Sequence, residues 1–280
     1  VAAPTSGDTI RFTTNPWTIH PAEVNRRCGL HDHVVVNDLE AIAHGVAYLA
    51  TDPDTAPFDR LAGPPWQPVA GGRIGVIGVG TGLGAATIDR PGPGTPGGSP
   101  RISATEAGHI GFAPVDAVDD AILRKLRERH GRVSVERVVA GPAITDIYHT
   151  LAAKEGDTDV EAQQSVTDVA LWARGLDPAG EDRRARAAVE RFCLTLGSVA
   201  GDIALAQGAF AGIVIAGGLG RRLGEVLPTS GFAERFTAKG RFRGVMETVP
   251  VVLLVHAEPG LLGAAAAYRE HSAGGERSDR

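Results

Sequence analysis

The sequence predicts an α/β fold in which the strands pair largely in parallel. Short apolar runs rich in Val and Ile alternate along the chain with longer segments that repeat apolar residues at helical spacing. Several of these runs are continuous, which is typical of strands that a parallel sheet buries on both faces. Three of them end in polar or glycine-rich turns, at residues 37–38, 80–82 and 217–218. Because ligands bind at the carboxyl ends of strands in such sheets, these turns are the candidate site.

The N-terminal quarter of the chain is expected to hold two strands and two helices. We expect a first strand at 9–13 and the start of a helix at 21–27. The β-branched run at 34–36 predicts a buried parallel strand, and residues 39–49 repeat Ala, Ile and Val at helical spacing. Residues 51–72 are rich in Pro, Gly and Asp and are expected to form a loop.

The remaining elements are predicted from the same two patterns: continuous apolar runs for strands, and apolar residues at helical spacing for helices. Strands are expected at 73–79, 85–88, 212–216 and 251–255, and helices at 118–129, 183–207 and 261–269, with a further helix starting at Gly141-Pro142. Residues 89–101 are low in complexity and are expected to form a mobile loop. The tail at 272–280 is polar, and we expect it to be disordered.

Composition excludes several classes of protein. The chain has 280 residues, a formal net charge of −5, 43% hydrophobic and 22% charged residues, which is ordinary for a soluble globular protein. No basic stripe stands out, so nucleic acid is not an expected partner. No apolar run is long enough to cross a membrane, and no leader opens the chain. The two cysteines, Cys28 and Cys193, are far apart, which argues against a disulfide framework or zinc site and favours a cytoplasmic protein.

Each residue of the turn at 37–38 allows two interpretations. Asp38 follows an apolar run and precedes a helix, so it can cap that helix or act as a general base toward a hydroxyl. From this residue alone the cap is favoured. Asn37 can form an Asx turn, or its amide can donate to and accept from a ligand hydroxyl.

Each of the two glycine turns also allows two interpretations. Gly80-Thr81-Gly82 predicts a tight hairpin, but its glycines also let backbone N–H groups approach phosphate oxygens, and the Thr81 hydroxyl adds a donor. It is no Walker loop, because no Lys-Ser/Thr follows, and a strand follows where a dinucleotide-binding motif has a helix. Gly217-Gly218 is either a plain strand-to-helix turn or bare backbone against which a flat ring can lie.

Three further side chains are candidates. Glu106 and His109 have the E-x-x-H spacing of two metal ligands, but Gly108 lies between them and no third ligand is near. They are either a surface carboxylate and a satisfied histidine, or a pair that clamps neighbouring hydroxyl groups. Glu136 alone is a surface carboxylate on the same reasoning.

Taken together, these segments resemble one family. The strings are VVVNDLEA, GVGTGLGAA, EAGHIGFAP, SVERVVAGPAI, IVIAGGL, GFAERFTAKGRF and HAEPGLLGAAA. In this order they resemble the bacterial glucokinase family of the actin-like sugar kinases, over nearly the whole chain. The cysteine-rich zinc motif of the related repressor and open-reading-frame kinases is absent, which favours the group without zinc.

The resemblance implies a hexokinase-like fold of two actin-like lobes with the site between them. The small lobe would comprise 1–48 plus 257–280 and the large lobe 49–256. The implied substrates are glucose and ATP with Mg²⁺, and a homodimer is one implied assembly. The implied roles are a catalytic base at Asp38; glucose binding by Asn15, Asn37, Asp38, Glu106, His109 and Glu136; a second phosphate loop at Gly80, Thr81 and Gly82; and an adenosine motif at Gly217 and Gly218. The loop at 89–101 would adjoin the sugar site.

One part of the family pattern is not in this sequence. Family members begin with a D-x-G-G-T phosphate loop, whose Asp helps to place magnesium, and the sequence holds no such string. We therefore expect a small lobe that is truncated at its N-terminal side. Alternatives to a glucokinase are a sugar-binding or regulatory protein without catalysis, an inactive fragment, and a related kinase for mannose or fructose.

Overall fold

The computed structural model describes residues 8–12, 16–51, 57–67, 69–95, 98–157 and 166–278, and the side chains up to 272. The strands are β1 (Ile10–Arg11), β2 (Thr18–Ile19), β3 (Phe58–Ala62), β4 (Arg73–Val79), β5 (Leu83–Asp89), β6 (Arg101–Thr105), β7 (Gly212–Ala216) and β8 (Val251–Leu254). The longer helices are α1 (Pro21–Cys28), α2 (Asp38–Leu49), α3 (Ala117–His130), α4 (Ala143–Lys154), α6 (Asp168–Leu176), α7 (Arg183–Gln207) and α11 (Pro259–Ser278). The shorter ones are η1 (Ala107–His109), η2 (Val135–Arg137), α8 (Gly218–Arg222), η3 (Leu227–Thr229), α9 (Phe232–Thr237), η4 (Gly240–Phe242) and α10 (Arg243–Met246).

The central sheet has six strands in the order β3-β8-β7-β4-β5-β6. Strands β8, β7 and β4 pair in parallel, whereas β3, β5 and β6 join by antiparallel pairing. The α/β class is confirmed, but the expectation of largely parallel pairing is wrong. Tight glycine-containing connections such as 80–82 can join only antiparallel neighbours, because a parallel pair needs a crossover of a dozen or more residues.

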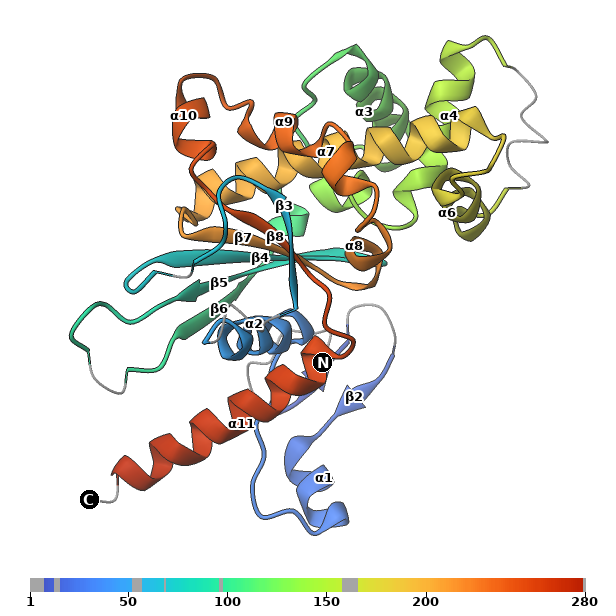
Figure 1. Cartoon of the computed structure of the whole chain (residues 1–280). Helices are drawn as coiled ribbons and strands as arrows, with labels where there is room; N and C mark the ends of the chain where they lie inside the picture. The colour runs from blue at the N-terminus through green and yellow to red at the C-terminus, as the bar shows by residue number, and fades with distance from the viewer. Residues whose placement is uncertain are drawn as a thin grey trace.

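Helices cover both faces of this sheet, with α7 and α9 on one side and α2, backed by α11, on the other (Figure 1). Successive residues of one strand point to opposite faces. Val76 and Val252 therefore pack with α2, whereas Ile77 and Leu253 pack with α7. This double coverage explains why the strands are continuous apolar runs in the sequence.

Two segments differ from expectation near the N-terminal quarter. The run Val34, Val35 and Val36 is irregular and half-buried, and it belongs to neither sheet of the described residues. β-branched side chains favour extended backbone, but a strand also needs a partner edge, which composition does not reveal. Conversely, β3 lies within the expected loop at 51–72. It is an edge strand on β8, and its exposed Asp59 and Arg60 are the charges that such edges tolerate.

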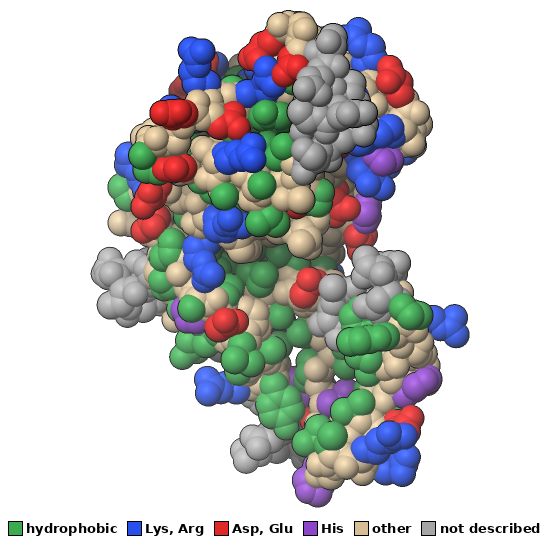
Figure 2. Space-filling model, turned by 90° about the vertical axis from the view of Figure 1, so that its right-hand side faces the viewer, with side chains coloured by type: hydrophobic (Ala, Val, Ile, Leu, Met, Phe, Trp, Pro, Cys, Tyr) green, Lys and Arg blue, Asp and Glu red, His purple; other side chains and the backbone are tan. Residues whose placement is uncertain are grey.

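The C-terminal helix is also longer than expected. α11 runs from Pro259 to Ser278, so the expected end near residue 269 is wrong, and so is the expected disorder over 272–278; residues 279–280 lie outside the described residues. Its start packs closely on α2, since a Cβ on Gly263 would lie 1.6 Å from the Ala41 carbonyl oxygen. No helix in the described part of the chain is long and apolar enough to cross a membrane. Basic and acidic side chains are interspersed on the face shown in Figure 2.

Leu39 anchors the start of α2 on the sheet. Gly78 of β4 and Gly84 of β5 are paired across the two strands, and the Leu39 side chain lies over both of them. A Cβ on Gly78 would be 2.6 Å from Leu39 Cδ1, and one on Gly84 would be 2.8 Å from Leu39 Cδ2. Because both glycines lack a side chain, the leucine can descend to the backbone. It thereby holds the first turn of α2 beside the carboxyl end of β4 and the start of β5.

A charge cluster ties three helices together on the other side of the sheet. Asp116 caps α3 by accepting from the Val118 and Asp119 N–H groups, at 2.9 and 3.0 Å. Its other oxygen accepts from Arg191 of α7, at 2.7 Å, and from Arg235 of α9. Burial alone would raise the pKa of Asp116, but the hydrogen bond from Arg191 and those from the backbone outweigh it and hold the pKa well below its ordinary value of 3.8.

The Asp116 cluster predicts acid sensitivity of the fold. Since the folded pKa of Asp116 is depressed, the stabilisation is fully present above the unfolded pKa of 3.8 and is lost as pH falls toward the folded value. Urea unfolding at pH values above and below 3.8 gives the free energy of unfolding of wild type and of Asp116→Asn. The difference between the two proteins should become smaller in acid. A difference that stays constant with pH would contradict this role.

Candidate active site

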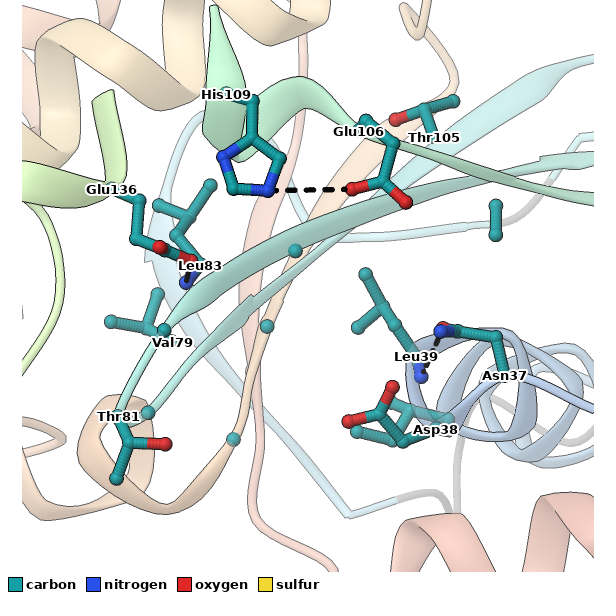
Figure 3. A pocket seen from close by; sticks show the side chains of 17 residues that line it. Asn37, Asp38, Leu39, Val79, Thr81, Leu83, Thr105, Glu106, His109 and Glu136 are labelled. Atoms are coloured by element: carbon teal, nitrogen blue, oxygen red, sulfur yellow. Dashed lines mark hydrogen bonds and ion pairs between the residues drawn. The ribbon is translucent and has the colours of Figure 1, made fainter. Parts of the chain in front are cut away.

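A cavity of about 600 Å³ lies at the carboxyl ends of β4 and β7. Its walls come from the start of α2, the β4–β5 turn, the end of β6, η1, η2 and the residue before α8 (Figure 3). The predicted site residues that line it are Asn37, Asp38, Gly80, Thr81, Gly82, Glu106, His109, Glu136 and Gly217. Gly218 follows Gly217 but does not line the cavity, and Asn15 lies outside the described residues. The fold thus joins segments that extend along the sequence from Asn37 to Gly217.

Asn37, and not Asp38, caps α2. The Asn37 side-chain oxygen accepts from the N–H groups of Leu39 and Glu40, at 2.9 and 3.4 Å. Glu40 completes a capping box by accepting from the Asn37 N–H at 3.2 Å. The cap interpretation of Asp38 is therefore wrong. Asp38 is the first helical residue, it is exposed, and its carboxylate points into the cavity (Figure 3).

The turn at 80–82 is a hairpin whose backbone also faces the cavity. The Gly80 N–H donates to the Gly82 carbonyl at 2.9 Å, and the Gly80 carbonyl accepts from the Gly141 N–H at 2.8 Å. Within the described residues, no group accepts from the N–H of Thr81 or Gly82. The hairpin and the phosphate-binding interpretations are therefore compatible, because the turn leaves two backbone donors for an anion.

Glu136 is more than a surface carboxylate. It is half-buried, and its Oε2 accepts from the Leu83 N–H at 3.0 Å. A Cβ on Gly82 would lie 2.7 Å from the same oxygen, so the absence of a side chain at 82 lets the carboxylate approach the turn. Glu136 thus reaches both the cavity and the end of the turn opposite Gly80.

Glu106 and His109 stand at the rim of the cavity on η1. Their side chains are 80% and 63% exposed, and His109 Nε2 lies 3.8 Å from Glu106 Oε2. Gly108 between them is buried, and a Cβ there would lie 2.0 Å from the Leu83 carbonyl oxygen. Only glycine allows this close approach, which places both side chains above the start of β5. No cluster of three His, Cys, Asp or Glu side chains able to hold a metal occurs in the part of the chain that is described.

Gly217 closes the cavity on the side of β7. Its φ of 95° lies in the left-handed region, and a Cβ there would be 2.4 Å from the Val79 carbonyl oxygen. A side chain at 217 would therefore clash with the end of β4. At Gly218 no atom lies within 4 Å of such a Cβ, so the backbone there borders open space.

The described part of the loop at 89–101 is remote from this cavity. Asp89 pairs with Arg101 at one end of the β5–β6 hairpin, whereas Leu83 and Thr105 line the cavity at the other end. None of the loop's described residues lines the cavity, so the expectation that it adjoins the site is wrong. The sequence analysis placed Gly141 only at the start of a helix and did not predict its contact with the turn at Gly80.

Solved structures define the class of protein that has this fold. A glucokinase from an Antarctic psychrotroph superposes with a TM-score of 0.79 at 32% identity, over 96% of this chain and 79% of the other. A ROK family glucokinase from Streptomyces griseus, in complex with glucose and AMPPNP, has a TM-score of 0.60 over 96% and 79%. Its identity of 18% supports the fold alone. The fold is that of the actin-like sugar kinases, as predicted.

Sequence comparison gives the family within that class. The family model described as Glucokinase matches residues 1–271. The glucokinase of Zymomonas mobilis is 45% identical over 267 residues, which are 95% of this chain and 78% of that protein. The chain belongs to the glucokinase family, which confirms the prediction from its motifs.

Proposed function

We propose that this protein transfers the γ-phosphoryl group of ATP to the 6-hydroxyl group of glucose, with Asp38 as the general base. The observation that carries the proposal is the position of Asp38: its carboxylate is exposed in the same cavity as the Gly80–Gly82 turn and is not used to cap α2. Family membership supports the same reaction.

In the proposed reaction, the Asp38 carboxylate accepts the proton of the 6-hydroxyl as its oxygen bonds to the γ-phosphorus. The bond from that phosphorus to the bridging oxygen breaks, and the products are glucose 6-phosphate and ADP. Charge and positioning dominate such a transfer. We assign the other glucose hydroxyls to Asn37, Glu106, His109 and Glu136 on the cavity wall, and to Asn15 by family resemblance.

The phosphates and adenosine are assigned to the two glycine turns. The N–H groups of Thr81 and Gly82 and the Thr81 hydroxyl are proposed to bind phosphate oxygens, and Gly217-Gly218 to border the adenosine. Mg²⁺ in kinases is held by substrate phosphates with one or two carboxylates. Because Asp38 is assigned to the sugar hydroxyl, the group on the cavity wall that fits a metal arriving with ATP is the Thr81 hydroxyl. When bound, it would neutralise charge on the phosphates.

We also propose the division into a small lobe of 1–48 plus 257–280 and a large lobe of 49–256. The close packing of α2 on α11, through Gly45, Gly263 and Ala41, supports grouping these two helices. Closure of one lobe on the other would exclude water, which otherwise competes as phosphoryl acceptor.

The test is to measure sugar binding and turnover on the same preparation. Calorimetry with glucose, mannose and fructose gives the affinities, and an assay coupled to ADP formation, with ATP, Mg²⁺ and each sugar in turn, gives the rate. We expect glucose to bind and to be phosphorylated. Glucose binding without turnover would instead support a non-catalytic sugar-binding protein, and turnover with mannose or fructose alone would support a different hexokinase.

Glu106→Gln should weaken glucose binding more than it slows the chemical step. The proposed contacts of Glu106 exist in both the ground state and the transition state, so their loss raises KM with little change in kcat. A hydrogen bond to a charged group contributes about 1.5–3 kcal/mol, so the affinity should fall roughly tenfold or more. Glu128→Gln, at an exposed position on α3, is the control. A fall in kcat at unchanged KM would contradict the assignment.

A further inference from the structure

Trp172 of α6 lies outside the cavity but is linked to its glycine turn. The side chain is 2% exposed and packs edge-on against Phe192, with ring centroids 5.0 Å apart and an interplanar angle of 87°. Its indole Nε1–H donates to the Gly141 carbonyl oxygen at 2.9 Å. A buried indole N–H is usually satisfied by some acceptor, but this acceptor belongs to the residue that holds the turn.

Gly141 transmits this contact to the turn. Its N–H donates to the Gly80 carbonyl at 2.8 Å, and the Gly80 N–H donates to Gly82 at 2.9 Å. A Cβ on Gly141 would lie 3.3 Å from the Gly80 carbonyl oxygen, tighter than ordinary van der Waals contact. Three hydrogen bonds in series therefore run from the indole to the turn, whose residues line the cavity.

The hydrogen bonds of Gly141 fix both of its peptide planes, and its carbonyl accepts a second, longer bond from the Ile144 N–H at 3.4 Å. Its N–H and its carbonyl belong to different peptide planes, which rotate about the two backbone dihedrals of a residue without a Cβ. Trp172 fixes the carbonyl plane and Gly80 accepts from the N–H plane. With the indole donor removed, the carbonyl plane keeps only the longer bond from Ile144, so it is held less firmly, and the N–H that holds Gly80 loses part of its fixed direction.

We propose that Trp172 is a positioning residue for the phosphate turn: through Gly141 it fixes Gly80–Gly82 in the arrangement that binds the phosphates of ATP. This inference rests on the function proposed above. The other end of the turn is held separately, by Glu136 at Leu83. Loss of the Trp172 contact should therefore affect nucleotide binding selectively and leave the glucose side of the cavity in place.

The test is Trp172→Phe, which keeps an aromatic ring against Phe192 and removes only the donor. Trp66→Phe is the matched control: Trp66 also packs edge-on against a phenylalanine, Phe58, at 4.5 Å and 89°. Its buried Nε1, however, has no hydrogen-bond partner among the described residues. In Trp172→Phe we expect roughly tenfold weaker binding of a non-hydrolysable ATP analogue, glucose affinity within about twofold of wild type, and faster hydrogen exchange of the Gly80 and Gly141 N–H groups, whose acceptors lie in this series. Trp66→Phe should change none of these.

Three results would overturn the proposal: equal losses of nucleotide and glucose affinity, a lower melting temperature with unchanged affinities, or unchanged exchange of the Gly80 and Gly141 N–H groups without ligand. The exchange measurement decides the positioning role even if wild type binds no nucleotide, an outcome that would refute the proposed function separately. If Trp172→Phe does not fold, Gly141→Ala disturbs the contact between Gly141 and the Gly80 carbonyl instead, and unchanged exchange of the Gly80 N–H in that variant overturns the inference.

Discussion

Asp38→Asn should lower the turnover rate by about 10²–10⁴-fold while glucose affinity changes little, because general-base catalysis typically contributes a factor of that size. The amide keeps the shape of the carboxylate and can still accept a hydrogen bond from the 6-hydroxyl group, but it cannot take its proton. Measurement of kcat in the coupled assay, with glucose affinity by calorimetry, separates these two effects.

The stability of Asp38→Asn should remain close to that of wild type, since the cap of α2 is Asn37. The substitution removes only a carboxylate near a helix N-terminus, an interaction of about 0.3–1 kcal/mol. Asp120→Asn is the matched control, because Asp120 is an exposed carboxylate in the first turn of α3, away from the cavity. An Asp38→Asn enzyme with wild-type turnover would remove the central residue of the proposed mechanism.

Elements buried on both faces were the most predictable from sequence. The strand at 73–79, the strand at 212–216 and the helix at 183–207 match the structure to the residue. Each has one dominant signal: continuous β-branched residues bounded by glycine, or apolar residues repeated at helical spacing over many turns. In these segments, burial against neighbouring elements requires the same apolar residues that local strand or helix propensity favours.

Elements that depend on a distant partner were not predictable in this way. The run at 34–36 has strong strand preference but belongs to neither described sheet, whereas β3 has charged residues and becomes a strand because β8 offers an edge. The hairpin predicted at 80–82 implies the antiparallel pairing of β4 with β5, whereas the pairing of β5 with β6 was not predicted, because no strand was expected at 101–105. A single sequence contains none of this long-range information in its local pattern.

For the candidate site, the identity of the residues was predictable from sequence, but their geometry was not. Its residues were found through their motifs, and the structure brings nine of the predicted ones to one cavity. Their geometry was not accessible: whether Asn37 or Asp38 caps α2 depends on backbone angles at the helix start. The positions of Gly78, Gly84 and Gly108 depend on contacts with segments elsewhere in the chain. A glycine in a sequence shows that a close approach is allowed, but not which atom approaches.

Gly108→Ala should weaken glucose binding by roughly tenfold or more and destabilise the fold by about 1–3 kcal/mol, as overpacking typically does. The new Cβ would lie 2.0 Å from the Leu83 carbonyl oxygen, which is backbone and cannot rotate away. The η1 segment must therefore move off β5. Because Glu106 and His109 flank Gly108 on that segment, both proposed glucose ligands move with it. Calorimetry with glucose and urea unfolding measure the two effects.

Gly111→Ala, three residues further on, is the control for this prediction. No atom lies within 4 Å of a Cβ at 111, and its φ is not positive, so an alanine fits there without displacing η1. If the close contact of Gly108 with Leu83 positions Glu106 and His109 at the cavity, Gly108→Ala loses glucose affinity and Gly111→Ala does not. Wild-type affinity in a destabilised Gly108→Ala protein would mean that these two side chains do not bind the sugar from η1. Equal losses at 108 and 111 would mean that the loop responds to any added side chain.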